Sequence, residues 1–349
     1  MSAKNRIRVV FLTPEMAPLA KTGGLADVTG ALPKYLSRNP RLEVAVMMPL
    51  HREVRKKNLS LKLKLEGLEI NWPGAEKIFS VYEYQADGFP VYLIDNPAFY
   101  DRDYLYGTAE GDYPDNGERF AFFSLATLKT LPALDFKPDL IHAHDWQSAL
   151  AFAYLRRGRQ ADDFLARTRL LFTIHNLAYQ GLFPPELLEK IGLPATLFNP
   201  DNLEFYGRVN FLKAGLLYSD AISTVSPTYS LEIQTPEFGF GLDGVLRLRS
   251  DRLFGILNGI DYQDWNPATD PALPAHYSQD NPAGKTVCRL ELLRAFNFPL
   301  ATPRPIIGMV SRLAGRKGFD LLVRSLDKLL QEEVYLVILG TGEKEIQNL

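Results

Sequence analysis

The sequence predicts an α/β protein built from doubly wound parallel sheets. Buried strand patterns alternate with helical patterns along most of the chain, and the intervening segments are long enough to be crossover helices. Glycine or polar residues follow several of the strands directly. With 349 residues and 46% hydrophobic composition, the chain is long enough for two domains with sizeable cores.

The first βα unit starts with a buried strand at residues 7–15 and continues into a helix at 25–38, which Pro33 weakens or kinks. A second buried strand follows at 43–50. The pattern changes between residues 61 and 93, where residues 61–70 alternate between apolar and polar positions and an Asp-Gly turn follows at 87–88. This pattern is typical of hairpins, so we expect inserted antiparallel strands there.

The α/β alternation returns near residue 116. The elements that we expect are a helix at 117–131, a strand at 139–143, a helix from 146, a strand at 169–174, a helix at 209–218, a strand at 221–226 and a helix from 227. Strands separated in this way by helices indicate parallel βαβ units.

A Pro-rich polar segment at 264–280 interrupts this pattern and is interpreted as a linker. A new α/β unit begins at residue 305. We therefore expect a first domain at 1–257 and, at 258–349, a linker with the first part of a second domain. Only two clear strands and one long helix belong to that second unit, so we expect it to be incomplete in this chain.

Charge and cysteine content exclude several classes of protein. Lys and Arg total 39 and Asp and Glu total 41, which argues against nucleic-acid binding as the main function. A single cysteine, Cys288, provides neither a disulfide framework nor a Cys-based zinc site. The first apolar run is too short for a signal peptide, and no segment reaches membrane-span length. We expect a cytoplasmic protein without a membrane partner.

Candidate ligand-binding residues follow the strands, because ligands of open parallel sheets bind beyond the carboxyl ends of the strands. They are Glu15, Lys21, Gly23, Gly24 and Asp27 after the first strand, Asp145, His175 and Asn176 after two central strands, Asn258 near the linker, and Arg312, Lys317, Gly340 and Gly342 in the second unit.

Each feature also has a structural interpretation. A glycine pair before a helix is as often a tight turn as a ligand contact, and a histidine at a strand end is often only a structural hydrogen-bond partner. His142 and His144 would face the same side of a strand, but no third ligand has a matching spacing, so a metal site is not favoured. Arg312 and Lys317 lie in a glycine-containing loop that enters a helix, which favours an anion.

Six motifs occur in an order that resembles the bacterial glycogen synthase and plant starch synthase family. They are PEMAPLAKTGGLADVTGALP, IHAHDWQSAL, FTIHNLAYQGLF, STVSPTYSLEI, GILNGIDYQDWNP and GMVSRLAGRKGFDLL. The resemblance spans about residues 6–342, and the KTGGLAD run is its most specific part. The pair formed by Arg312 and Lys317 is shared with many other two-domain glycosyltransferases.

The resemblance implies a GT-B fold, in which two Rossmann-like domains face each other across a cleft. It also implies glucose transfer from ADP-glucose to the non-reducing end of an α-1,4-glucan such as glycogen or a maltooligosaccharide, with retention of configuration and no bound metal or other cofactor. Glu15, Lys21, Asp145 and His175 match catalytic positions. The positions that match donor or phosphate contacts are Lys21, Gly23, Gly24, Asp27, Asn176, Asn258, Arg312, Lys317, Gly340 and Gly342.

Two departures from the family pattern are visible. Gln147 follows Trp146 where many relatives carry His, and nothing after Gly342 supplies the glutamate-rich motif of the family's second domain. The resemblance therefore implies that the 349-residue chain alone is inactive. Two alternatives stay open, a UDP-glucose-using GT-B relative and a catalytically inactive, truncated glucan-binding remnant.

Overall fold

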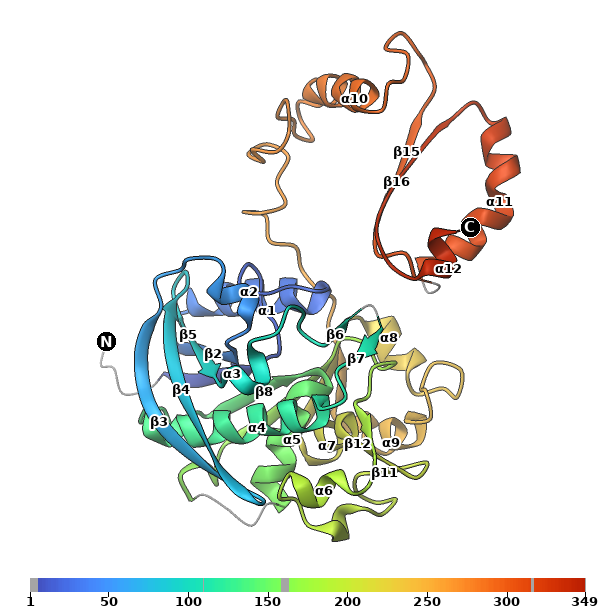
Figure 1. The fold of residues 1–349 in the computed structure, drawn as a ribbon. Helices are drawn as coiled ribbons and strands as arrows, with labels where there is room; N and C mark the ends of the chain where they lie inside the picture. The colour runs from blue at the N-terminus through green and yellow to red at the C-terminus, as the bar shows by residue number, and fades with distance from the viewer. Residues whose placement is uncertain (1–5, 109, 158–162, 315–316, 349) are drawn as a thin grey trace. The chain divides into compact units, whose positions relative to one another are not determined.

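The computed structural model describes residues 6–108, 110–157, 163–314 and 317–348, which form two compact units, Met1–Ile260 and Asp261–Leu349. The division lies three residues beyond the boundary expected between 257 and 258. Figure 1 shows the course of the chain through the elements of both units.

Unit 1 is organised around a nine-stranded sheet. Its strands in spatial order are β14 (Leu253–Gly255), β13 (Ala221–Thr224), β9 (Arg169–Ile174), β8 (Leu140–His144), β1 (Ile7–Leu12), β2 (Leu42–Pro49), β5 (Pro90–Asp95), β4 (Ala75–Gln85) and β3 (Lys62–Trp72). The pairs from β14 to β5 are parallel, and β4 and β3 add antiparallel at the edge. The predicted parallel sheet and inserted hairpin are thus confirmed.

The chain order reverses beside β1. The strands that follow β1 directly extend the sheet toward β2 and β5, whereas β8, β9 and β13 extend it on the opposite side. β1 and β8 therefore flank a topological switch point, the place where loops leave a doubly wound sheet in opposite directions and open space for ligands.

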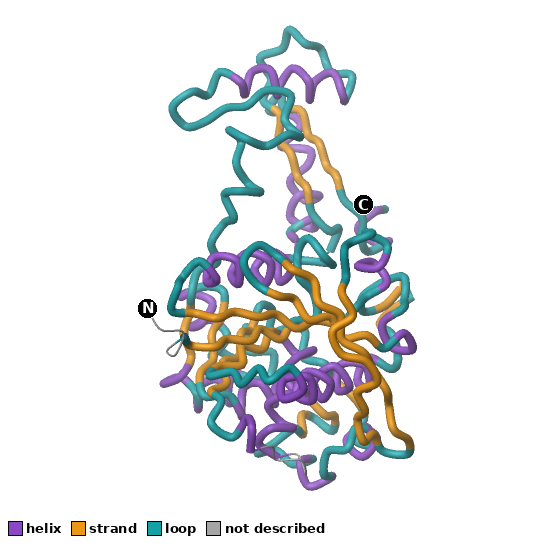
Figure 2. The backbone as a smooth tube through the Cα atoms, turned by 90° about the vertical axis from the view of Figure 1, so that its left-hand side faces the viewer, coloured by secondary structure: helices purple, strands orange, loops and turns teal. Residues whose placement is uncertain are grey.

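Both faces of this sheet are covered, which explains the near-continuous apolar strands. Successive residues of β1 enter two different cores, with Val9 and Phe11 in one and Val10 and Leu12 in the other. Figure 2 shows the orange strands between purple helices. The helices of unit 1 are α1 (Gly24–Ser37), α2 (Arg52–Arg55), α3 (Pro97–Tyr100), α4 (Asn116–Ala133), α5 (Asp145–Arg157), α6 (Leu187–Lys190), α7 (Phe211–Tyr218), α8 (Pro227–Glu232) and α9 (Asp243–Leu248).

The loops of unit 1 contain several short strands. β10 (Leu182–Phe183), β12 (Arg208–Asn210) and β11 (Glu204–Phe205) form a three-stranded sheet, and β6 (Gly107–Thr108) pairs with β7 (Gly111–Asp112). The apolar–polar pattern of the sequence did not predict these strands, because each has only two or three residues.

Unit 2 contains a two-stranded parallel sheet, β15 (Ile306–Val310) with β16 (Tyr335–Leu339). Its helices are α10 (Gly284–Ala295), α11 (Phe319–Gln331) and α12 (Lys344–Gln347). The segment 256–283 contains neither helix nor strand and includes the linker predicted at 264–280, whereas α10 was not predicted. Among the described residues no helix is both long and apolar enough to cross a membrane.

The packing of α7 on the sheet generates the first prediction. A Cβ atom at Gly215 would lie 2.5 Å from two ring atoms of Phe172, so Gly215→Ala should force the helix away from β9. We expect it to lower the free energy of unfolding by about 1–3 kcal/mol. At Gly244 in α9 the nearest atom would be 3.9 Å away, so Gly244→Ala should stabilise by roughly 0.5–1 kcal/mol. Urea unfolding of both variants would contradict this packing if their midpoints moved in the same direction.

Candidate functional site

Residues from three strand ends meet at the switch point. Glu15 and the segment 20–27 follow β1, Asp145 follows β8, and His175 follows β9. All lie at the carboxyl edge of the sheet because β1, β8 and β9 are parallel neighbours. The five predicted residues Glu15, Lys21, Asp27, Asp145 and His175 therefore lie on one edge of one unit.

Glu15 ties the loop after β1 to α1. Its side chain is only 3% exposed, and its carboxylate accepts hydrogen bonds from Thr22 N at 2.7 Å and Thr22 Oγ1 at 2.6 Å. Its carbonyl accepts from the hydroxyls of Thr13 and Thr29, each at 2.7 Å. A buried carboxylate needs such donors, and these fix the start of the glycine-containing loop.

The loop itself carries an exposed ion pair beside open space. Lys21 Nζ lies 2.6 Å from Asp27 Oδ1, and both side chains are nearly half exposed. A Cβ atom at Gly23 or Gly24 would meet nothing within 4 Å. By contrast, a Cβ at Gly30 would lie 2.5 Å from the Ala17 carbonyl. Packing explains Gly30, whereas at Gly23 and Gly24 the absence of a side chain leaves free volume above the loop.

Asp145 has an unusual conformation and environment. Its φ of +52° is in the left-handed region, which Asp tolerates better than most residues. Its carboxylate accepts from the backbone N–H of His175 at 2.7 Å. Burial raises the pKa of Asp145 to about 7, with a further contribution from the Glu15 charge, although the N–H groups of His175 and Asn176 oppose the shift. The carboxyl thus titrates near neutral pH.

Three histidines lie close together near Asp145, with His142 and His144 buried and His175 half-buried. His175 Nε2 and His144 Nδ1 are 2.9 Å apart, so one donates to the other. His142 Nε2 bonds to Thr173 Oγ1 at 2.6 Å, and Thr173 continues to Ser223 Oγ at 2.6 Å. Burial lowers the pKa of His142 to about 3 and that of His175 to about 4, and it also lowers the pKa of His144. All three rings are therefore neutral at pH 7.

Tyr106 joins the site from a segment for which the sequence pattern predicted no role. Burial raises its pKa, and the nearby charges of Glu15 and Asp145 raise it further, while its hydroxyl hydrogen-bonds to the Thr22 side chain. Buried Arg119 positions this segment through hydrogen bonds to the carbonyls of Phe99 and Leu105. The strand that precedes it, β5, ends at Asp95, so a search for residues directly after strands could not have found Tyr106.

The remaining predicted residues are divided between the two units. Asn176 lies next to His175 and accepts from the Ala178 N–H at 3.1 Å, and Asn258 is exposed in the segment after β14. In unit 2, Arg312 and Lys317 are exposed and precede α11. Neither side chain has an ion pair within the part of the chain that the structure describes.

Gly340 and Gly342 have a packing role within unit 2. A Cβ atom at Gly340 would lie 2.1 Å from the Ser311 carbonyl, and one at Gly342 would lie 2.1 Å from the Leu313 carbonyl. Leu313 also exchanges backbone hydrogen bonds with Thr341 and Glu343. These two glycines are needed for the close approach of the two loops, whatever ligand contact they also make.

No group of three or more His, Cys, Asp or Glu side chains among the described residues is arranged to hold a metal ion. The two neighbouring histidines, His142 and His144, do face one another, with ring centroids 4.1 Å apart. One nitrogen of each ring is engaged, His142 Nε2 by Thr173 and His144 Nδ1 by His175, while His144 Nε2 has no hydrogen-bond partner among the described residues.

The titration of Asp145 generates the second prediction. Its pKa is about 7 in the folded chain and 3.8 for an ordinary Asp, so the folded state binds the proton more tightly between about pH 4 and 7. Stability therefore falls as the pH rises through that window. Asp145→Asn removes this penalty, and its stability relative to the parent should increase between pH 5 and pH 8 by on the order of 2 kcal/mol.

Urea unfolding followed by tryptophan fluorescence at the two pH values would measure this difference. A gap between variant and parent that is the same at pH 5 and pH 8 would contradict the raised pKa of Asp145. Because the comparison uses the change in the gap, a constant cost of replacing the carboxylate does not affect it.

Comparison with known proteins agrees with this fold. A family model described as starch synthase catalytic domain matches residues 8–248. Glycogen synthase 2 of Geobacter sulfurreducens is 48% identical over 336 residues, which cover 96% of this chain and 69% of the relative. The glycogen synthase of Geotalea uraniireducens is 47% identical over 97% of this chain and 70% of its own length.

A solved structure, the catalytic domain of Starch Synthase IV from Arabidopsis thaliana bound to ADP and acarbose, matches with a TM-score of 0.89. It is 33% identical, and the match covers 99% of this chain and 70% of that chain. The predicted α/β fold of GT-B type is thereby confirmed. The chain belongs to the glycogen synthase and starch synthase family of glycosyltransferases.

Proposed function

We propose that this chain carries the site at which glucose is transferred from ADP-glucose to the non-reducing end of an α-1,4-glucan, with retention of configuration. One observation carries the proposal: a lysine, a glycine loop over open volume and two buried carboxylates share the switch-point edge. The names of the curated relatives, and the ADP and acarbose in the related starch synthase structure, support these two substrates.

The basic residues have the chemistry required for the diphosphate of the donor. We assign Arg312 and Lys317 to the phosphates because both are exposed, lack ion pairs among the described residues and precede a 13-residue helix. Backbone N–H groups at such a helix start favour anions. Lys21 is the third cation, and its ion pair with Asp27 is exposed enough for a phosphate to compete for it.

The polar edge formed by Asp145, His175 and Asn176 suits the donor glucose. Asp145 holds the His175 backbone through the 2.7 Å hydrogen bond, and His144 Nδ1 holds the imidazole through its Nε2 at 2.9 Å. The neutral imidazole can then contact a sugar hydroxyl without adding positive charge near the reacting carbon. The remaining contacts to the donor are assigned to Gly23, Gly24, Asn258, Gly340 and Gly342.

In this mechanism the protein stabilises charge and forms no covalent bond to the sugar. As the bond between glucose and ADP lengthens, negative charge grows on the diphosphate and positive charge on the anomeric carbon. Lys21 of unit 1 and the pair Arg312 and Lys317 of unit 2 are each assigned to the first charge, and the carboxylates of Glu15 and Asp145 are assigned to the second. Because cationic side chains of the chain are assigned to the diphosphate, we propose that transfer needs neither a metal nor another cofactor.

The phosphate assignment gives the third prediction. Arg312→Ala should lower the kcat/KM of the enzyme about a hundredfold, because a charge-assisted hydrogen bond to the developing negative charge on the diphosphate is lost. Arg312→Lys should also be impaired, since lysine cannot form two parallel bonds to a phosphate. Arg304→Ala is the matched control, because Arg304 pairs with Glu333 on the same unit. Rates of ADP release within a few-fold of the parent for Arg312→Ala would refute the assignment.

The donor gives the fourth prediction. With ADP-glucose and UDP-glucose competing in one assay containing maltoheptaose and EDTA, we expect ADP to be the main nucleotide released. EDTA should leave the rate unchanged, because the cations of the chain meet the phosphate charge. A larger release of UDP would identify a UDP-glucose-using relative. Glucan binding without release of either nucleotide would favour the non-catalytic alternative.

A further inference from the structure

Two exposed aromatic residues in unit 1 have a backbone conformation that such residues rarely adopt. Tyr206 and Phe240 each have a φ of +47°. Each is followed by a glycine that also has a positive φ, +78° at Gly207 and +81° at Gly241. The first pair forms the two-residue turn between β11 and β12, where Phe205 pairs with Arg208.

The backbone conformation does not favour aromatic residues at these positions, although the Tyr206 ring packs edge-on against Phe205 with centroids 4.7 Å apart. A two-residue turn with positive φ at both positions favours Asn-Gly or Asp-Gly, and a bulky residue there is strained by roughly 1–3 kcal/mol. Burial does not compensate, since Tyr206 is 81% exposed and Phe240 is 52% exposed. Strain combined with exposure indicates that the aromatic rings have a role outside the folded core.

The two turns are held against each other. A Cβ atom at Gly241 would lie 2.9 Å from the Phe205 ring and 3.1 Å from the Tyr206 ring. The Gln180 amide donates to the Phe240 carbonyl at 3.0 Å, and the Asn210 amide donates to Gln180 at 2.7 Å. Both hydrogen bonds come from buried side chains, so they fix the backbone of Phe240 relative to β12 before any ligand arrives.

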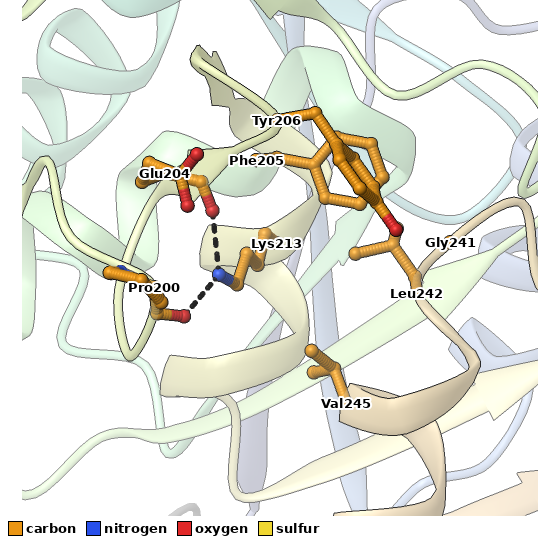
Figure 3. A pocket seen from close by; sticks show the side chains of 8 residues that line it. All are labelled: Pro200, Glu204, Phe205, Tyr206, Lys213, Gly241, Leu242 and Val245. Carbon is orange, nitrogen blue, oxygen red and sulfur yellow. Dashed lines mark hydrogen bonds between the residues drawn. The ribbon is translucent and has the colours of Figure 1, made fainter.

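A pocket of about 250 Å³ lies beside these turns (Figure 3). Its lining combines aromatic, aliphatic and polar groups, namely Pro200, Glu204, Phe205, Tyr206, Lys213, Gly241, Leu242 and Val245. Buried Lys213 donates to the carbonyls of Pro200 and Glu204. The Glu204 carboxylate accepts from the Gly207 N–H through one oxygen. None of these residues belongs to the switch-point site.

We propose that this pocket and the aromatic pair, Tyr206 and Phe240, bind an α-1,4-glucan chain. A pyranose ring offers an apolar C–H face to an aromatic ring and hydroxyl groups to polar neighbours, and the pocket supplies both. The volume suits a sugar residue, whereas a protein partner needs an interface of about 800 Å² on each side. An anion is disfavoured because the Glu204 carboxylate lines the pocket and Lys213 is already engaged by two carbonyls.

This inference rests on the proposed function for the identity of the sugar, since a glucan is the substrate assigned to the chain. It goes further by adding a second glucan-binding site, formed by residues that do not directly follow a strand of the large sheet and were not predicted from the sequence. Such a contact would retain a long glucan on unit 1 while one of its ends reacts.

The test uses the opposite effects expected for stability and binding. Tyr206→Asn and Phe240→Asn place the preferred residue in each turn, so each variant should unfold at a higher temperature than the parent. Each should also bind maltoheptaose about tenfold more weakly, because an aromatic stacking surface is lost. In the parent chain, maltoheptaose should shift the backbone amide NMR signals of Gly207 and Gly241.

Three controls make the outcome specific. Tyr35→Asn changes an exposed tyrosine on α1 and should leave the shifts at Gly207 and Gly241 intact. Lys21→Ala alters the switch-point site and should also leave them intact. Cellohexaose, a β-1,4-glucan of different shape, should cause smaller shifts than maltoheptaose.

The inference would be wrong if Tyr206→Asn bound maltoheptaose with the parent's affinity, as followed by the Gly207 and Gly241 signals. It would also be wrong if maltoheptaose did not shift these signals in the parent. Equal shifts with both oligosaccharides would likewise overturn it. Binding is read without turnover, so the two proposals fail separately. Loss of ADP release with these signals intact would count against the proposed transfer reaction alone.

Discussion

Two buried carboxylates at the edge of a parallel sheet are the constraint on which the rest of the site depends. Glu15 and Asp145 are both less than 10% exposed, so each needs hydrogen-bond donors nearby. The chain supplies them from its own loops, with Thr22 bonding to Glu15 and the His175 backbone bonding to Asp145. The same bonds that satisfy the carboxylates therefore fix the glycine loop and the strand end that carries His175.

This arrangement follows from the topology. Because strand order reverses beside β1, the loops after β1 and β8 leave the sheet in opposite directions, and the carboxylates meet between them. Folding retains an unfavourable feature at this point, since the charged form of Asp145 is disfavoured by burial. Tyr206 and Phe240 show the same pattern in their turns, where backbone strain is tolerated without compensating burial. Costs of this kind concentrate where a protein binds or reacts.

Much of the fold could be predicted from the sequence because apolar residues recur with different periods in strands and helices. The carboxyl ends of parallel strands also lie at one edge of the sheet. That reasoning identified Glu15, Lys21 and Asp145 from their positions alone. It could not supply the register of β8 on β9, which places His144 opposite Thr173 and so brings the histidine rings together. It also missed Tyr106, because Arg119 positions that segment through side-chain bonds that leave no periodic signal.

Glucosyl transfer with retention at this edge of the sheet can be tested from the product that it forms. The most direct measurement supplies the gene product with ADP-glucose labelled in the sugar, together with maltoheptaose, and analyses the oligosaccharide formed. The account predicts a labelled glucan one residue longer, whose new bond is an α-1,4 linkage at the non-reducing end, and loss of this product in Asp145→Asn. Label recovered as free glucose or in a β-linked product, or a fully active Asp145→Asn variant, would contradict it.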